Sequence, residues 1–308
     1  MTQAKPQTQT HAPERAETPR PSSVDDHVGD MHAPDLYVHD AVAEPLDGLD
    51  AITDKHIHEV FPSQGFLAVE NAFTPEEAEA AKQGMRDLAM GRNPEFTGIQ
   101  FEKAVQDKLD QLSAEQRLDG IRKLMSFCKH EPRLAHLAEH PKLLEVLRRL
   151  LGDREPKLFQ DMGLSKPPKI GREKPWHQDC AYFNLAPGTP VVGVWIALDE
   201  ATIDNGCMRL LGGGHHIGPV HHWKRRDWQI CDTDFYRLHD KEHPVIAAPL
   251  KPGGLLLFSG MLPHGTPHNN SGQRRRAVQY HYCPADAEWT ETEERLAIYG
   301  TEGKDVEC

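Results

Sequence analysis

The sequence predicts a mainly β protein in which helices pack on one side of a sandwich or barrel. Up to Gly152 several segments keep helical apolar spacing, whereas beyond it short apolar or alternating runs are separated by Gly, Pro, Asn and Asp. Helices followed by many short strands favour a sandwich or barrel over alternating βαβ units. The chain also lacks the GxGxxG and phosphate-loop motifs of nucleotide-binding folds. We therefore expect a single domain over residues 51–308.

The N-terminal elements follow from local signals. Residues 1–50 are rich in Pro, Thr, Gln, Glu and Asp without a sustained apolar period, so we expect a disordered tail outside the fold. Order should begin near Ile52. The apolar run 66–69 predicts a strand. Thr74, followed by Pro and then by Glu three residues on, predicts the start of a helix over about 75–90.

Two more helical regions and six strands complete the predicted fold. Apolar spacing predicts helices over about 101–126 and 132–151, so the helical segments cover about 75–151, and Gly152 ends the last one. Strands are expected, within a β region of about 157–283, at 157–162, 191–198, 207–211, 245–249, 254–259 and 277–283.

Composition and charge restrict the function classes. Forty-seven acidic against 35 basic residues give a formal charge of −12, which disfavours nucleic acid as a partner. No apolar run approaches the roughly 18 residues of a membrane span. Six scattered cysteines without a CxxC pair favour a reducing cytoplasm. The basic clusters 224–226 and 274–276 could each bind the carboxylate or phosphate of a small ligand, and 224–226 is equally well explained as a solvated surface turn.

The densest chemical signal is a potential metal site. His177 and Asp179 stand at positions i and i+2, which point the same way on an extended segment, and His264 directly follows the apolar strand at 255–258. Two His and one carboxylate on one face of an octahedron leave three positions open, as non-haem Fe(II) oxygenases require. Taken alone the pair is a weak signal, because 19 histidines yield such pairs by chance. Arg275, eleven residues after His264, strengthens it, since a guanidinium suits the distal carboxylate of a dicarboxylic acid.

With these four residues in place, the chain resembles the phytanoyl-CoA dioxygenase family of Fe(II)/2-oxoglutarate oxygenases over about residues 55–285. The resemblance implies a double-stranded β-helix core, which is a jelly roll of cupin type, and it implies Fe(II), 2-oxoglutarate and O2 as cofactor and co-substrates. The order and spacing of the matching strings are more specific than any one of them: GFLAVENAFTPEE, KPP at 166–168, HQDCAYF at 177–183, VWIALDEATIDNGCMRLLGGGHH at 194–216 and HGTPHNNSGQRRRA at 264–277.

The resemblance also implies roles for single residues. His177, Asp179 and His264 match the iron ligands at the catalytic centre, and Arg275 matches the residue that binds the side-chain carboxylate of 2-oxoglutarate. The neighbouring Arg274 and Arg276 are competitors, but residues adjacent on a strand face opposite sides, and the spacing favours the middle arginine. Other co-substrate contacts are implied at Lys123, for which Lys129 is an alternative, and at Met162, Gln178 and Trp195.

The implied reaction is hydroxylation of an aliphatic C–H of a small molecule, with release of succinate and CO2. Asp179 supplies a carboxylate ligand, which favours hydroxylation over halogenation, while desaturation and ring closure stay open. Carboxylated and CoA-linked molecules are both candidate substrates. The substrate should lie between Tyr182, Phe183, the helical segment before 130 and the aromatic and basic excursion 216–244, which is either a lid or an ordinary surface loop.

Alternative interpretations concern both the site and the function class. His215, His216, His221 and His222 are either a second metal cluster or loop histidines, and a structural or substrate-facing role is favoured for His215. The protein could instead be a jelly-roll Zn or Mn isomerase or hydrolase, or a non-catalytic 2-oxoglutarate-binding module. An isomerase or hydrolase needs no arginine clamp, and a non-catalytic module is expected to lose a ligand or the arginine. The sequence does not indicate the oligomeric state.

Overall fold

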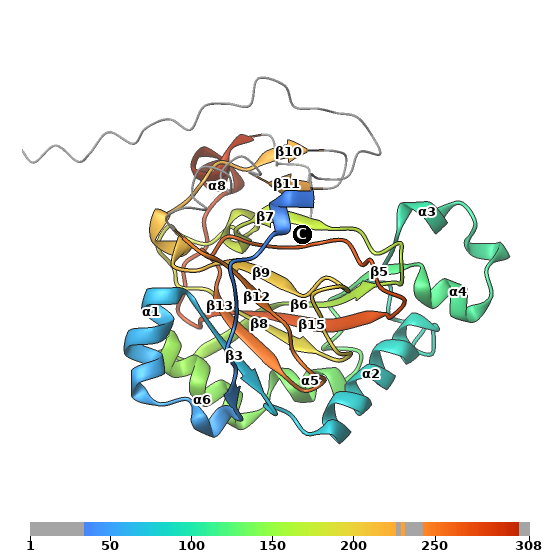
Figure 1. Cartoon of the computed structure of the whole chain (residues 1–308), viewed down its shortest axis with the longest axis horizontal. Helices are drawn as coiled ribbons and strands as arrows, with labels where there is room; N and C mark the ends of the chain where they lie inside the picture. Colours follow the sequence, from blue (N-terminus) through green and yellow to red (C-terminus); the bar gives the residue numbers. More distant parts are fainter. Residues whose placement is uncertain (1–33, 226–228, 232–242, 302–308) are drawn as a thin grey trace, which may run out of the picture.

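The computed structural model describes residues 34–225, 229–231 and 243–301 and builds them around two facing β-sheets (Figure 1). The larger sheet has the order β2 (Leu46–Asp47), β3 (Phe66–Glu70), β13 (Leu255–Ser259), β8 (Val192–Ala197), β15 (Arg275–Pro284), β6 (Pro156–Lys166), β5 (Ile121–Met125), β4 (Ile99–Phe101). The smaller has the order β1 (Ala41–Val42), β12 (Val245–Ala248), β9 (Met208–Leu211), β14 (His264–Thr266), β7 (Lys174–His177). A separate hairpin pairs β10 (Trp223–Arg225) with β11 (Gln229–Cys231).

The helices precede and flank the sheets. Figure 1 shows α2, α5 and α6 along one side of the layered sheets, and α3 and α4 near β5. The helices are α1 (Phe61–Gln64), α2 (Pro75–Ala89), α3 (Lys103–Gln106), α4 (Ala114–Asp119), α5 (Pro132–Ala138), α6 (Pro141–Leu150) and α8 (Thr292–Tyr299). Short turns of other helix types are η1 (Pro34–Tyr37), η2 (Leu49–Ala51), η3 (His56–Val60), η4 (Leu109–Gln111), η5 (Asp179–Tyr182) and η6 (Gly214–Ile217).

Alternation along the central strands divides the core into two layers. On β8, Val194 and Ile196 join the cluster beneath the helices, whereas Trp195 and Ala197 join the cluster between the sheets. The same period of two repeats on β3 and β13. Both faces of the larger sheet are therefore buried, and its central strands are apolar almost throughout.

Most predicted elements are confirmed, as is the mainly β class. The helix predicted at 75–90 is α2, which begins with a capping box in which Thr74 and Glu77 bond each other's backbone amides. All six strands predicted beyond Gly152 are present. The helix predicted over 132–151 divides into α5 and α6, because Pro141 cannot continue α5 and instead occupies the first turn of α6.

The helix predicted over 101–126 is wrong. That stretch holds two short helices and then β5, which pairs with β6 through Lys123 and its neighbours. A capping box at Ser113 starts α4, but this helix ends at Gly120 after six residues. The apolar spacing suited a helix, and pairing with a strand some forty residues away in the sequence overrode that local preference.

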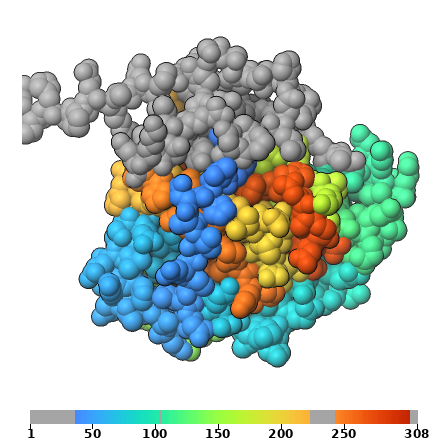
Figure 2. All heavy atoms as spheres, viewed as in Figure 1, coloured from blue at the N-terminus to red at the C-terminus, as the bar shows by residue number. Residues whose placement is uncertain are grey.

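The predicted start of the fold near residue 50 is also wrong, whereas residues 1–33 lie outside the described part of the chain. β1 pairs with β12 and β2 with β3, and Leu36, Tyr37 and Leu49 are buried. In Figure 2 this first described segment, in blue, lies along the outside of the molecule. The polar composition of residues 1–50 taken together gave no sign of the three buried side chains and two strand pairings in this segment, and those pairings depend on strands elsewhere in the chain.

The segment also supports the strand that leads into the candidate metal site. The backbone carbonyl of Leu36 accepts a hydrogen bond from the indole of Trp176 at 2.7 Å, and that of Tyr37 accepts one from Arg209 at 3.1 Å. Trp176 immediately precedes His177 on β7. Among the described helices, none is both long and apolar enough to cross a membrane.

Deleting residues 1–50 should therefore destabilise the protein relative to a chain that lacks only residues 1–33. Each of the three buried side chains contributes about 1.5–3 kcal/mol on burial, and the donors of Trp176 and Arg209 would lose their partners. Urea unfolding should show a lower midpoint for the larger deletion. Equal midpoints for the two chains would contradict the assignment of residues 34–50 to the fold.

Candidate active site

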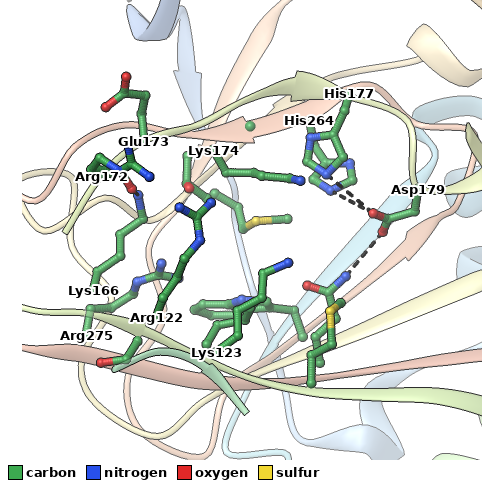
Figure 3. A pocket seen from close by; sticks show the side chains of 18 of the residues that line it. Arg122, Lys123, Lys166, Arg172, Glu173, Lys174, His177, Asp179, His264 and Arg275 are labelled. Atoms are coloured by element: carbon green, nitrogen blue, oxygen red, sulfur yellow. Dashed lines mark hydrogen bonds and ion pairs between the residues drawn. The ribbon is translucent and has the colours of Figure 1, made fainter. Parts of the chain in front are cut away.

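Three buried side chains converge at one end of the sandwich. His177 on β7 lies directly opposite His264 on β14, and the centroids of the two imidazole rings are 4.3 Å apart. Asp179 begins η5, and its Oδ1 lies 3.4 Å from His177 Nε2 and 3.7 Å from His264 Nε2. One ligand atom from each residue lies within 4.8 Å of the others (Figure 3). The described residues contain no other such group of His, Cys, Asp and Glu.

Backbone carbonyls select the nitrogen that each imidazole presents to a metal. His177 Nδ1 lies 2.7 Å from the Pro175 carbonyl oxygen, and His264 Nδ1 lies 2.9 Å from that of Leu262. A carbonyl oxygen accepts, so both Nδ1 atoms carry the proton and donate it. The Nε2 lone pairs are consequently directed into the site, as a metal-ligating histidine requires.

Burial and charge place all three groups in the protonation state of a ligand. Burial is the main cause that lowers the pKa of His177 and of His264, so both imidazoles are neutral near pH 7. Burial alone would raise the pKa of Asp179, but His264, His281 and the hydrogen bonds to Asp179 hold that pKa well below its usual range. The site thus offers two neutral nitrogens and one carboxylate.

Two further side chains hold Asp179, and the sequence interpretation missed both. His281 Nε2 lies 2.8 Å from Asp179 Oδ2, and Gln279 Nε2 donates to the same oxygen at 3.2 Å. Both come from β15, where His281 is fully buried. With Oδ2 occupied, Oδ1 is the oxygen left facing the imidazoles. A signal was available, because Arg275, Gln279 and His281 are polar residues of one parity on a strand otherwise rich in apolar residues.

A cavity of about 660 Å³, including its open mouth, extends from these ligands between the two sheets. Among its lining residues are three of the predicted co-substrate contacts: Lys123 on β5, Met162 on β6 and Trp195 on β8. In Figure 3, Lys123 points into the cavity between the ligand group and Arg275. Lys129, the alternative to Lys123, is exposed and does not line the cavity.

Arg275 lies at the opposite end of this cavity from the ligand group (Figure 3). Its side chain is only 2% exposed, yet Nε and Nη1 have no hydrogen-bond partner among the described residues. The guanidinium lies over the Trp195 ring at 5.3 Å, and the indole nitrogen of Trp195 is also unpartnered within that part of the chain. Burial lowers the pKa of Arg275 to about 10, so the group is still charged near pH 7. Buried unpartnered donors of this kind fit a ligand carboxylate.

The two neighbouring arginines face away from the cavity, as strand alternation predicts. Arg274 forms an ion pair with Asp119 at the end of α4. Arg276 donates to both carboxylate oxygens of Asp199, at 2.7 and 2.8 Å. Of the three consecutive arginines, only the middle one enters the site.

Gln178 is the predicted co-substrate residue that the structure places elsewhere. Its amide nitrogen donates to the carbonyls of Gly218 and Met261, and its amide oxygen accepts from the Val220 backbone. Gln178 is extended, so the alternation that brings its two neighbours together directs its own side chain away from the cavity. The Gln178 side chain therefore does not line the cavity and instead holds the segment 218–220 through Gly218 and Val220.

The histidines that follow β9 have structural partners rather than a shared metal site. His215 Nε2 contacts the Pro62 carbonyl at 2.8 Å, and His222 accepts a hydrogen bond from the Gln178 backbone at 2.9 Å. Burial lowers the pKa of His222 to about 4, in keeping with that acceptor role. Tyr182 lies beside His177, whereas Phe183 packs on Phe159. Residues 226–228 and 232–242 of the predicted lid lie outside the described residues, including Trp228, Phe235, Tyr236 and Arg237.

Comparison with known families agrees with this geometry. The model of the phytanoyl-CoA dioxygenase (PhyH) family matches residues 61–277. The chain belongs to this family. The phytanoyl-CoA dioxygenase domain-containing protein 1 of Danio rerio is 26% identical over 272 residues, which are 77% of this chain and 92% of the relative. The phytanoyl-CoA dioxygenase of Arabidopsis thaliana is 32% identical over 136 residues, 44% of this chain and 47% of the relative.

Solved structures share the fold of this PhyH family member. EctD from S. alaskensis in its apoform superposes with a TM-score of 0.63 at 22% identity, covering 81% of this chain and 82% of EctD. The non-haem α-ketoglutarate-dependent carbocyclase SnoK from nogalamycin biosynthesis superposes with a TM-score of 0.62 at 19% identity, covering 83% and 93%. The predicted jelly-roll core with flanking helices is thereby confirmed.

Replacing His281 by Phe should weaken Fe(II) binding about 10–100-fold, the usual loss when an outer partner of a metal ligand is removed. The ring of Phe suits the space between Phe159 and Phe183 but cannot donate to Asp179. Anaerobic calorimetric titration with Fe(II) measures the effect, and His281→Asn, which keeps a donor, should recover part of it. A folded His281→Phe variant with the iron affinity of the wild type would contradict this positioning role.

Proposed function

We propose that the protein is an Fe(II)- and 2-oxoglutarate-dependent oxygenase that hydroxylates an aliphatic C–H of a small molecule and releases succinate and CO2. Family membership supports the oxygenase class. The observation that carries the proposal is one cavity with a buried His177, Asp179 and His264 at one end and a buried, unpartnered guanidinium of Arg275 at the other. A dicarboxylate that binds metal at one end would fit between them.

Each residue would have a defined task in this reaction. His177, Asp179 and His264 would hold the iron, and Arg275 would bind the distal carboxylate of 2-oxoglutarate. Bound together, iron and 2-oxoglutarate supply the activation of O2 and the oxidising power. The chain supplies fixed ligand orientation through the Pro175 and Leu262 carbonyls and a largely buried cavity that limits access of water.

Asp179 favours hydroxylation over halogenation. A halide needs a vacant metal position, and the carboxylate of Asp179 fills it from the protein. Its other oxygen accepts hydrogen bonds from Gln279 and His281, so the carboxylate is held in one orientation. An iron with this carboxylate ligand would insert oxygen rather than a halide, at a carbon decided by the position of the substrate.

A Zn or Mn isomerase or hydrolase on the same fold is the alternative, since it would also use two His and a carboxylate. Such an enzyme needs no buried arginine at the far end of the cavity. The unpartnered Arg275 and the adjacent indole of Trp195 therefore favour the 2-oxoglutarate reaction. A non-catalytic module is disfavoured because the ligands and the arginine are all present in one cavity.

We also propose that the enzyme works in a reducing compartment such as the cytoplasm. Cys128, Cys180, Cys207 and Cys283 are free thiols. Free thiols that are partly or fully buried suit a compartment in which disulfides do not form.

The function can be tested by adding Fe(II) and 2-oxoglutarate to the protein under anaerobic conditions. A weak visible charge-transfer band should appear, because chelation by 2-oxoglutarate requires open positions on an iron held by the protein. The double variant Asp179→Ala, His264→Ala should lose the band. Absence of the band from the wild type, or an unchanged band from the double variant, would overturn the proposal.

Replacing Arg275 by Gln should raise the dissociation constant of 2-oxoglutarate at least about tenfold, since a charged hydrogen-bonding partner is lost. Iron affinity should change little, because Arg275 lies at the other end of the cavity. Both constants can be obtained by anaerobic titration followed through the visible band. Arg276→Gln, on the same strand but with its side chain directed away from the cavity, serves as a matched control. Equal effects of Arg275→Gln on iron and on 2-oxoglutarate would count against a co-substrate clamp.

A further inference from the structure

A second cavity adjoins the turn η5, which begins with Asp179. Its volume is about 960 Å³, including its open mouth, and no described residue lines both this cavity and the one that contains the metal ligands. Cys180, the residue after Asp179, lies in its wall together with residues of α8, of the segment 185–191 and of the end of β13. We name this space the α8 cavity.

The described lining of the α8 cavity is mainly apolar. Its larger apolar side chains include Phe61, Leu150, Phe183, Val191, Val192 and Ile298. Binding sites for small molecules usually combine a lining of this kind with a few polar groups that fix the orientation of the ligand. An apolar space next to the turn of a metal ligand therefore suits the hydrocarbon part of a small molecule.

Arg295 on α8 is the one charged side chain among the described residues that line the α8 cavity. It is only 8% exposed. Its Nε donates to Asn184 Oδ1 at 2.7 Å, and its Nη1 donates to the Ala181 carbonyl at 2.6 Å, so both partners are neutral. Nη2 has no hydrogen-bond partner among the described residues and is not fully buried. The guanidinium therefore retains a donor for a further ligand.

The positive charge of Arg295 has no counter-ion among the described residues. The glutamates at the start of α8 are exposed and form no ion pair with it. Burial raises the pKa of the Cys180 thiol and of the Tyr299 hydroxyl, so both stay neutral near pH 7. The other described lining residues carry no ionisable side chain. A largely buried charge without a counter-ion is costly, and a bound anion would remove that cost.

We propose that the α8 cavity is a second binding site, separate from the metal site, and that it takes a monocarboxylate with an apolar tail. The carboxylate binds Arg295, and the tail lies against the apolar wall. One carboxylate balances the single positive charge of the described lining. A phosphate monoester, with a charge of about −1.5 to −2 at pH 7, would leave an excess of negative charge in an apolar space. The inference is independent of the proposed function, because it involves none of the metal ligands.

The test uses the full-length protein with Fe(II) and saturating 2-oxoglutarate under anaerobic conditions, so that the metal cavity is occupied. Four probes share one eight-carbon chain and differ in the head group: octanoate, octyl phosphate, octanamide and octylamine. In isothermal calorimetry octanoate should bind at least about tenfold more tightly than octanamide, and more tightly than the other two probes. Butanoate, which is four methylenes shorter, should bind at least about tenfold more weakly than octanoate, because it buries less apolar surface.

Variants locate the bound probe. Ile298→Trp enlarges a side chain of the lining and should weaken octanoate binding at least about tenfold, whereas Ile203→Trp, at an exposed isoleucine that lines neither cavity, should retain the affinity. Arg295→Met removes the charge and should make octanoate and octanamide bind equally. Because Arg295 also fastens α8 to Ala181 and Asn184, the thermal unfolding midpoint of each variant is recorded. If Arg295→Met does not fold, Ile298→Trp decides.

Equal binding of octanoate and octanamide by the wild type overturns the inference, as does tighter binding of octyl phosphate or octylamine, or no detectable binding of octanoate. Octanoate affinity that a folded Ile298→Trp variant retains in full overturns it as well, because the probe then occupies another site, such as the metal cavity. The visible band of Fe(II) and 2-oxoglutarate, recorded before any probe is added, tests the oxygenase function alone. The two proposals therefore fail separately.

Discussion

The strict alternation of side chains along β15 is the constraint on which the rest of the structure depends. Of the residues of one parity, Arg275 and Gln279 line the cavity, and His281 contacts Asp179 at the end where the metal ligands lie. Residues of the other parity face the helices. There the hydroxyls of Tyr280 and Tyr282 donate to the backbone carbonyls of Leu134 and Ala138 in α5, each at 2.7 Å. Because β6 and β8 pair with β15 on both sides, its register cannot slip without moving every one of these groups.

The second constraint is the electrostatic cost of what this strand buries. An isolated buried charge is expensive, and Arg275 and Asp179 are each at most 2% exposed. Asp179 is stabilised by Gln279 and His281, whereas two guanidinium nitrogens of Arg275 have no partner among the described residues. A fold rarely retains such a group without a ligand, and violations of ordinary burial rules are expected where binding occurs. The cost at Arg275 is therefore consistent with a cavity organised for a dianion and a metal.

Local periodicity predicted the part of the site that lies on regular strands. Side-chain alternation predicted which of the three consecutive arginines enters the cavity. Applied to Gln178, which lies between two metal ligands, the same alternation directs the side chain away from the cavity, where the family resemblance had implied a contact with 2-oxoglutarate. The errors at 101–126 and 34–50 have another cause. Whether β5 is a strand, and whether β1 and β2 belong to the fold, depends on pairing with strands distant in sequence. Such backbone hydrogen bonds leave little trace in local composition.

The two sheets divide the chemistry between them. The smaller sheet supplies the imidazoles from β7 and β14, and these two strands pair with each other. The larger sheet supplies Arg275 and the side chains that hold Asp179. Two other cations that line the metal cavity come from the margin, with Arg122 on the penultimate strand β5 and Arg172 in the segment before β7. Edge strands and connecting segments have fewer constraints than a central strand paired on both sides. The histidine ligands and Arg275 thus come from paired strands at the centre of the fold, whereas Arg122 and Arg172 come from its margin.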